Sequence, residues 1–195
     1  MTEKIQQNRL EMQLAAQCAP LLTGIKISNL FIVDIQEKEE VIKLFEKTAI
    51  SYAVIYESEA KLTFLLYLEE KLLDYMNQKP VRDLMRILGH SDSRLASVFV
   101  EVKKRYTAYM ERREQFPHEL GLLLGYPAED VAGFIQNNGK NFLYTGYWKV
   151  YGDVKRALNL FEQYNKAKKA VTQMVASGTS IHSIINSYMI SRNLE

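Results

Sequence analysis

The sequence contains few of the residues that cross-link a chain, interrupt it or give it a strong net charge. Its 195 residues include one cysteine, four prolines and three histidines, and the formal net charge is +2. The single cysteine, Cys18, excludes a disulfide within the chain and a zinc site built on several cysteines. So small a net charge does not by itself indicate a nucleic acid or membrane partner. No apolar run is long enough to cross a membrane and the first residues do not read as a signal peptide, so we expect a cytoplasmic protein.

Motifs for metals, phosphates and common cofactors are also missing. The histidines are His90, His118 and His182, and no two of them have the spacing of paired metal ligands. No glycine-rich phosphate loop is present, and basic runs alternate with glutamates along expected helices, which is typical of a solvated helix face. The sequence therefore predicts no metal site and identifies no cofactor. Its charge pattern also argues against a nucleic acid partner.

The pattern of apolar residues predicts an α+β fold. Three runs have the composition of strands, and the short polar link between the second and third predicts an antiparallel hairpin. These runs are Ile27–Ile35, Ser51–Tyr56 and Leu62–Leu68. Helical spacing dominates from Glu69 onward, including a long helix capped by Asp153. We expect a small, mostly antiparallel sheet packed with several helices, and a C-terminal half rich in helix.

The chain is expected to form one α+β domain over residues 1–176, followed by a link and a terminal helix over residues 177–195. Ser177 to Ser180 form a short flexible link. After it comes an amphipathic stripe that is too apolar to remain in water, made of Ile181, Ile184, Ile185, Tyr188 and Met189. A helix of about a dozen residues is marginal alone, so it must dock on its own domain or on a second copy. We predict a homodimer that uses residues 180–192.

The segment from Phe116 to Gly152 is the most informative part of the chain, with two of the four prolines and the only tryptophan. Pro117 and Pro127 suit the starts of two short helices at about 117–124 and 127–137, and Gly125 suits the turn between them. Such a hairpin resembles a DNA-binding helix-turn-helix in its spacing. However, the first turn of the second helix carries Glu129 and Asp130, which would repel phosphates. Two helices packed together without DNA are therefore favoured over a regulator built on residues 117–151.

A strand is expected at about 142–151, with alternating residues on its two faces. Gly146, Trp148 and Val150 would share one face, and Tyr147, Lys149 and Tyr151 the other. An aromatic face with a central lysine suits a planar or anionic ligand, although a structural ladder of aromatic residues is also consistent with it. The candidate ligand-binding residues are Tyr126, Tyr147, Lys149 and Tyr151.

The sequence offers one set of residues for covalent catalysis, namely Cys18 as nucleophile with His118 and Glu119 as base and orienting group. A cysteine nucleophile needs a base close by and surroundings that lower its pKa. Nothing in the sequence shows that Cys18 and His118 meet, and a lone cysteine beside alanine and proline is typical of a small buried residue.

Several motifs resemble a family of uncharacterised bacterial proteins. They are Cys18-Ala19-Pro20 with Gly24-Ile25-Lys26 and Asn29-Leu30, then Phe116-Pro117-His118-Glu119, Gly125-Tyr126-Pro127, Asp130-Val131, Gly133-Phe134-Ile135 and Gly146–Tyr151. The resemblance is to a domain of unknown function found mainly in anaerobic Gram-positive bacteria, and it covers about residues 18–168. It implies a bacterial, cytoplasmic protein and brings no assigned activity.

The function is therefore unknown at the level of the sequence, and three hypotheses stay open. The leading one is a domain that binds a small molecule or a protein without catalysing a reaction. The first alternative is an enzyme that uses Cys18 and His118, and the second is a helix-turn-helix regulator.

Overall fold

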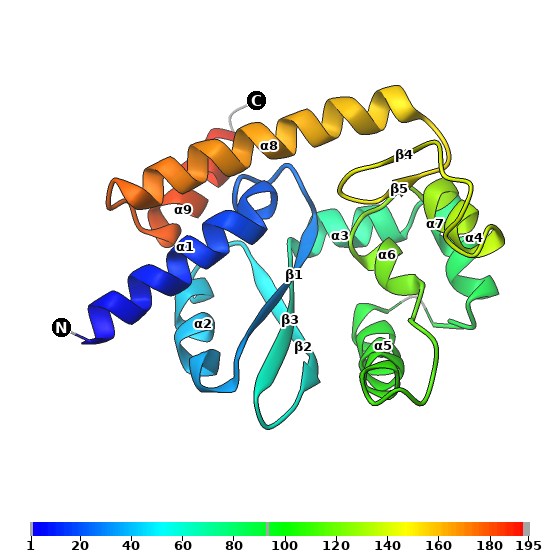
Figure 1. Cartoon of the computed structure of the whole chain (residues 1–195), viewed down its shortest axis with the longest axis horizontal. Coiled ribbons are helices and arrows are strands. Elements are labelled where there is room, and N and C mark those ends of the chain that lie inside the picture. Colours follow the sequence, from blue (N-terminus) through cyan, green and yellow to red (C-terminus); the bar gives the residue numbers. More distant parts are fainter. Residues whose placement is uncertain (1, 93, 193–195) are drawn as a thin grey trace. The chain divides into compact units, whose positions relative to one another are not determined.

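The structure, a computed structural model, describes residues 2–92 and 94–192 (Figure 1). The chain divides into two compact units. Unit 1 takes in the chain to Ala53, the segment Glu57–Leu68 and the chain from Glu162, and unit 2 takes in Val54–Tyr56 and Glu69–Phe161. The predicted boundary at residue 176 stays a prediction. Residues 1 and 93 of the predicted domain and residues 193–195 of the predicted tail lie outside the described residues.

Unit 1 contains β1 and β3 of a three-stranded sheet whose strand order is β1-β3-β2. The three strands are β1 (Ser28–Asp34), β2 (Ser51–Glu57) and β3 (Lys61–Tyr67). β1 and β3 are antiparallel, with Ser28 opposite Tyr67 and Asp34 opposite Lys61. β3 is the middle strand, and its residues 62–66 are all buried. The sequence therefore predicted these strands correctly.

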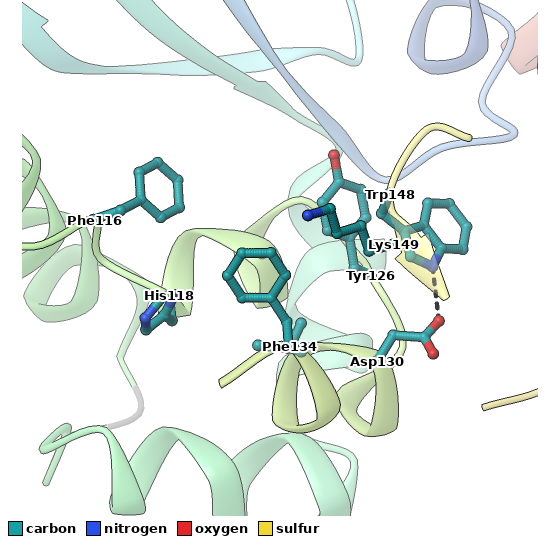
Figure 2. Close-up of a pocket in the computed structure, with 9 residues that line it drawn as sticks. Phe116, His118, Tyr126, Asp130, Phe134, Trp148 and Lys149 are labelled. Carbon is teal, nitrogen blue, oxygen red and sulfur yellow. Dashed lines mark hydrogen bonds between the residues drawn. The ribbon is translucent and has the colours of Figure 1, made fainter. Parts of the chain in front are cut away.

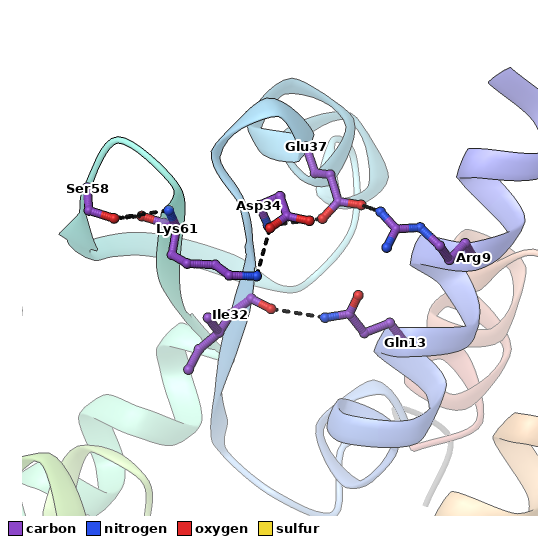
Figure 3. Close-up of polar contacts among 7 residues, drawn as sticks. All are labelled: Arg9, Gln13, Ile32, Asp34, Glu37, Ser58 and Lys61. Carbon is purple, nitrogen blue, oxygen red and sulfur yellow. Dashed lines mark hydrogen bonds and ion pairs between the residues drawn. The ribbon is translucent and has the colours of Figure 1, made fainter. Parts of the chain in front are cut away.

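Helix α1 (Thr2–Leu22) is attached to β1, the strand at one edge of this sheet. Figure 3 shows Gln13 donating a hydrogen bond to the carbonyl of Ile32 at 3.0 Å, and Arg9 paired with Glu37 just beyond the strand. Glu37 is buried and also accepts the N–H of Asp34 at 3.1 Å. An edge strand exposes unpaired backbone groups, and the helix covers one of them here.

The C-terminal helix α9 (Ile181–Arg192) lies beside α1 of its own chain, and both belong to unit 1 (Figure 1). Ile181, Ile184 and Ile185 are buried, and the Ile181 N–H donates to Glu11 at 3.1 Å. The first N–H groups of a helix lack partners within the helix, so Glu11 satisfies one of them. α9 also contacts α2 (Lys38–Phe45), which follows the short helix η1 (Ile35–Glu37). The homodimer through residues 180–192 stays a prediction.

Unit 2 is mainly helical. Its helices are α3 (Glu69–Met76), α4 (Lys79–Ile87), α5 (Leu95–Met110), α6 (Glu119–Leu123), α7 (Ala128–Gln136) and the start of α8 (Val154–Ala176). α7 packs against α4 and α6, and α3 packs against α4 and α6. Asp153 accepts the N–H of Arg156 at 2.9 Å, so it caps α8 as the sequence predicted. The α+β class is confirmed, with helix predominating in the C-terminal half.

The single strand expected at 142–151 is wrong, because this run folds back on itself. It forms a small hairpin of β4 (Tyr144–Thr145) and β5 (Lys149–Val150), with Tyr144 opposite Val150. The turn is closed by the Gly146 N–H, which donates to the Trp148 carbonyl at 3.0 Å. Gly146 approaches Phe161 so closely that a Cβ atom there would lie 2.4 Å from the ring. Only glycine permits this approach, and alternation along one strand gives no sign of it.

Candidate functional site

The α6–α7 hairpin supplies most of the candidate site, and its turn is fixed by local backbone chemistry. The Tyr126 N–H donates to the Gly121 carbonyl at 3.0 Å, and the Gly125 N–H donates to Leu122 at 2.8 Å. This pair of bonds is the Schellman motif that ends a helix, and it requires positive φ at its penultimate residue. Gly125 has φ +74°. The motif directs Tyr126 away from the end of α6, next to the start of α7.

Asp130 in the first turn of α7 holds the β4–β5 hairpin. Its Oδ2 atom accepts the indole N–H of Trp148 at 2.7 Å, and its Oδ1 atom accepts the backbone N–H groups of Tyr151 at 2.7 Å and Gly152 at 2.8 Å. The carboxylate is 3% exposed. Sequence reasoning took Asp130 for a surface acid facing a hypothetical DNA partner, whereas it points inward. The expectation of no nucleic acid partner stays a prediction, and Asp130 no longer supports it.

A cavity of about 180 Å³ lies among these elements of unit 2 (Figure 2). Trp148 and Tyr126 form one stacked wall, with ring centroids 5.1 Å apart and planes inclined by 26°. Trp148 also packs against Phe161 in a T-shaped contact, with ring centroids 4.5 Å apart. The residues that line the cavity are Phe116, His118, Gly121, Tyr126, Asp130, Val131, Phe134, Trp148 and Lys149. The rings of Phe116, Tyr126, Phe134 and Trp148 give this lining its aromatic character.

His118 and Lys149 also line the cavity and supply its basic side chains. His118 lies 6.2 Å from Phe116 and 5.6 Å from Phe134, measured between ring centroids. The Lys149 ammonium lies over the Phe134 ring at 5.6 Å and donates to the Gly139 carbonyl at 2.7 Å. In Figure 2 these side chains extend across the view from Phe116 and His118, past Phe134, to Lys149. The arrangement presents ring faces together with a positive charge.

Two of the four predicted ligand-binding residues, Tyr126 and Lys149, line this cavity, and the other two do not. Tyr147 packs against Phe161 at 5.5 Å. The Tyr151 ring lies on Gly133 of α7, where a Cβ atom would lie 2.5 Å from it. The sequence pattern misses Phe116, Phe134 and Trp148 as lining residues. All three lie in motifs that carry the family resemblance, namely Phe-Pro-His-Glu, Gly-Phe-Ile and Gly146–Tyr151. These motifs are the sequence signal that could have indicated them.

The three residues proposed for catalysis lie in different surroundings. His118 and Glu119 belong to unit 2 and Cys18 to unit 1. Cys18 is fully buried, and burial raises the pKa of its thiol to about 12, so the thiol is protonated at neutral pH. Cysteine catalysis needs the thiolate, so the protonated thiol of Cys18 is not an activated nucleophile. The pairing of Cys18 with His118 stays a prediction.

Glu119 is held by partners other than His118. Its Oε1 atom accepts from Arg105 Nη1 at 2.9 Å and lies 3.2 Å from His90 Nε2. Burial by itself would raise the pKa of Glu119, but the bond with His90 and the charge of Arg105 outweigh it and lower the pKa. Arg105 also donates to the Leu88 carbonyl at 2.9 Å, so this cluster joins α5, α6 and the end of α4. Glu119 therefore stabilises the helices that carry the cavity.

Lys26 is a second buried ionisable group in unit 1, close to Cys18. Its ammonium donates to Asn29 Oδ1 at 2.8 Å, and Asn29 Nδ2 donates to the Cys18 sulfur at 3.4 Å. Burial lowers the pKa of Lys26 to about 8. These three residues come from the motifs of the N-terminal family resemblance, which the fold brings together.

We predict that Lys26 makes stability depend on pH between pH 8 and 9. The unfolded chain keeps this lysine protonated up to about pH 10.5, so it binds more protons than the folded chain above pH 8. The free energy of unfolding should therefore rise by about 1 kcal/mol over this interval relative to Lys26→Met. Urea denaturation at both pH values measures it. Above pH 9 ionisation of Cys18 in the unfolded chain opposes the rise.

The matched control is Lys43→Met, which removes an exposed lysine of α2 in the same unit. Its stability should follow that of the wild type in parallel across the interval. Parallel curves for Lys26→Met and wild type would show that Lys26 titrates as an ordinary lysine.

No group of three or more His, Cys, Asp or Glu side chains among the described residues is arranged to hold a metal ion. Among the helices described, none is both long enough and apolar enough to cross a membrane.

Fold and site define an α+β protein with an aromatic cavity in its helical unit. The chain belongs to the family described as Protein of unknown function (DUF3793), which matches residues 14–185. The match is longer than the resemblance over 18–168 and reaches the beginning of α9. No curated protein and no solved structure matches the chain.

Proposed function

We propose that this protein binds a small planar aromatic molecule in the cavity of unit 2. The observation that carries the proposal is the stacked pair of Tyr126 and Trp148, which faces an opening of about 180 Å³. Binding sites for drug-sized ligands occupy about 300–1,000 Å³, so this cavity suits a ligand of one or two rings. Aromatic walls prefer offset or edge contacts with another ring, which a planar ligand provides.

The side chains of Trp148 and Tyr126 are held in place without a ligand. Asp130 fixes the indole of Trp148, and the turn at Gly125 fixes Tyr126. A site whose side chains are already ordered loses little conformational entropy on binding. We place the activity in the bacterial cytoplasm, supported by the family resemblance and by a buried, unpaired cysteine.

The only tryptophan of the chain lines the cavity, so its fluorescence is a probe of this one site. We expect some members of a panel of small aromatic compounds to change Trp148 emission saturably, with dissociation constants between about a micromolar and a millimolar. Phe134→Ala removes one wall and should weaken binding about tenfold.

Phe142→Ala is the matched control. Both rings lie under the Lys149 ammonium, Phe134 at 5.6 Å and Phe142 at 4.9 Å, but only Phe134 lines the cavity. Phe142→Ala should change affinity by less than about twofold. The proposal fails if no compound gives a saturable change, or if both variants weaken binding equally.

A further inference from the structure

We infer that the ligand carries a negative charge and that Lys149 and His118 bind it, which makes the ligand class a planar aromatic carboxylate. This inference rests on the proposed function and specifies it. It follows from the charged side chains that line the cavity. The ammonium of Lys149 can still donate hydrogen bonds, whereas the carboxylate of Asp130 is already bonded to the β4–β5 hairpin.

The one acid among the residues that line the cavity is already satisfied. Asp130 receives three N–H donors, from Trp148, Tyr151 and Gly152, at 2.7–2.8 Å. Hydrogen bonds to a carboxylate stabilise its charged form and use its acceptor positions. Asp130 therefore acts as a fixed structural anion behind the wall, and its oxygens are committed to the hairpin.

Lys149 keeps donors available. Its ammonium has three N–H groups and gives one to the Gly139 carbonyl at 2.7 Å. Within the part of the chain that the structure describes, it forms no ion pair with a carboxylate. The rings of Phe134 and Phe142 hold the charge between their faces at 5.6 and 4.9 Å. A cation positioned in this way, beside an apolar cavity, matches a ligand carboxylate.

His118 adds a second donor to the lining of the cavity. Its ring nitrogens have no hydrogen-bond partner among the described residues, and it lies next to Phe134, the ring that Lys149 covers. A neutral imidazole donates one N–H, and a protonated one donates two, so either form suits a carboxylate. A cationic ligand would use the aromatic faces equally well, but Lys149 would repel it.

The test is isothermal titration calorimetry with acid and amide pairs of the same shape, namely benzoate with benzamide and phenylacetate with phenylacetamide. Wild-type protein should bind each acid about tenfold or more tightly than its amide. Lys149→Met keeps the aliphatic stem and should weaken binding of the acid much more than binding of the amide, so most of this preference should be lost. Lys140→Met removes an exposed lysine between α7 and β4 that does not line the cavity, and it should preserve the preference.

The outcomes separate this inference from the proposed function. Equal binding of acids and amides, or equal weakening of both in Lys149→Met, overturns the negative charge while the cavity remains a binding site. Absence of binding for both members of every pair contradicts both proposals. Lys149→Arg retains the charge, so it should keep the preference if loss in Lys149→Met reflects charge rather than misfolding.

Discussion

Asp130→Ala is expected to lower the free energy of unfolding by about 3–5 kcal/mol. The substitution leaves the indole N–H of Trp148 and the backbone N–H groups of Tyr151 and Gly152 without their acceptor. Buried donors that lose a charged partner bear the full cost of their desolvation. Urea denaturation followed by Trp148 fluorescence measures the effect, because this tryptophan belongs to the segment that Asp130 anchors.

Asp130→Asn separates the hydrogen bond to the Trp148 indole from the hydrogen bonds to the backbone of Tyr151 and Gly152. The amide retains an oxygen for Tyr151 and Gly152, but its NH₂ group faces the indole N–H, so only the bond to Trp148 is lost. We expect a loss of about 1–2 kcal/mol. Trp148→Phe, measured by circular dichroism, should cost less in the Asp130→Asn background than in wild type. Additive losses in the two backgrounds would show that the indole bond contributes nothing.

Glu119→Ala is expected to lower the free energy of unfolding by about 3 kcal/mol, because it removes the partner of Arg105 and His90 in a buried cluster. The side chain of Glu119 is 2% exposed. The lowered pKa of Glu119 means that its contribution is present above the carboxyl pKa of the unfolded chain, near 4.5, and is lost as the pH falls below it. Denaturation at pH 7 and pH 4 measures both effects.

Glu101→Gln provides the control on the same arginine. Glu101 binds Arg105 at 3.1 Å, but its side chain is 38% exposed, so this pair should contribute less than about 0.5 kcal/mol. If Glu101→Gln costs as much as Glu119→Ala, burial is not what makes the Glu119 cluster important. A Glu119→Ala protein as stable as wild type would mean that water replaces the carboxylate.

Elements that depend on local chemistry could be predicted from the sequence. The α6–α7 hairpin follows from Pro117, Gly125 and Pro127, because each restricts or frees the backbone at its own position. The cap of α8 at Asp153 follows from the same kind of local rule. The β1 and β3 strands follow from runs of buried apolar residues.

Features that depend on distant contacts could not be predicted. The turn at Gly146 exists because Phe161 lies against it, and no alternation in residues 142–151 reports that neighbour. An acid in the first turn of a helix is usually interpreted as a partner of the helix dipole, so the inward orientation of Asp130 was missed. The residue types of Tyr126 and Lys149 indicate a binding site. Phe116, in the loop before α6, and Phe134, in α7, reach the cavity only through the packing of these segments.

The most direct test of the account uses the indole N–H resonance of Trp148 in a two-dimensional ¹H–¹⁵N spectrum. The chain has one tryptophan, so this resonance is unique, and its N–H is bonded to Asp130 at the cavity wall. Titration with phenylacetate should shift it progressively to saturation, and the same titration of Lys149→Met should shift it much less at equal ligand concentration. An indole resonance that stays in place while resonances elsewhere shift to saturation would contradict the account, because the ligand would then bind outside this cavity.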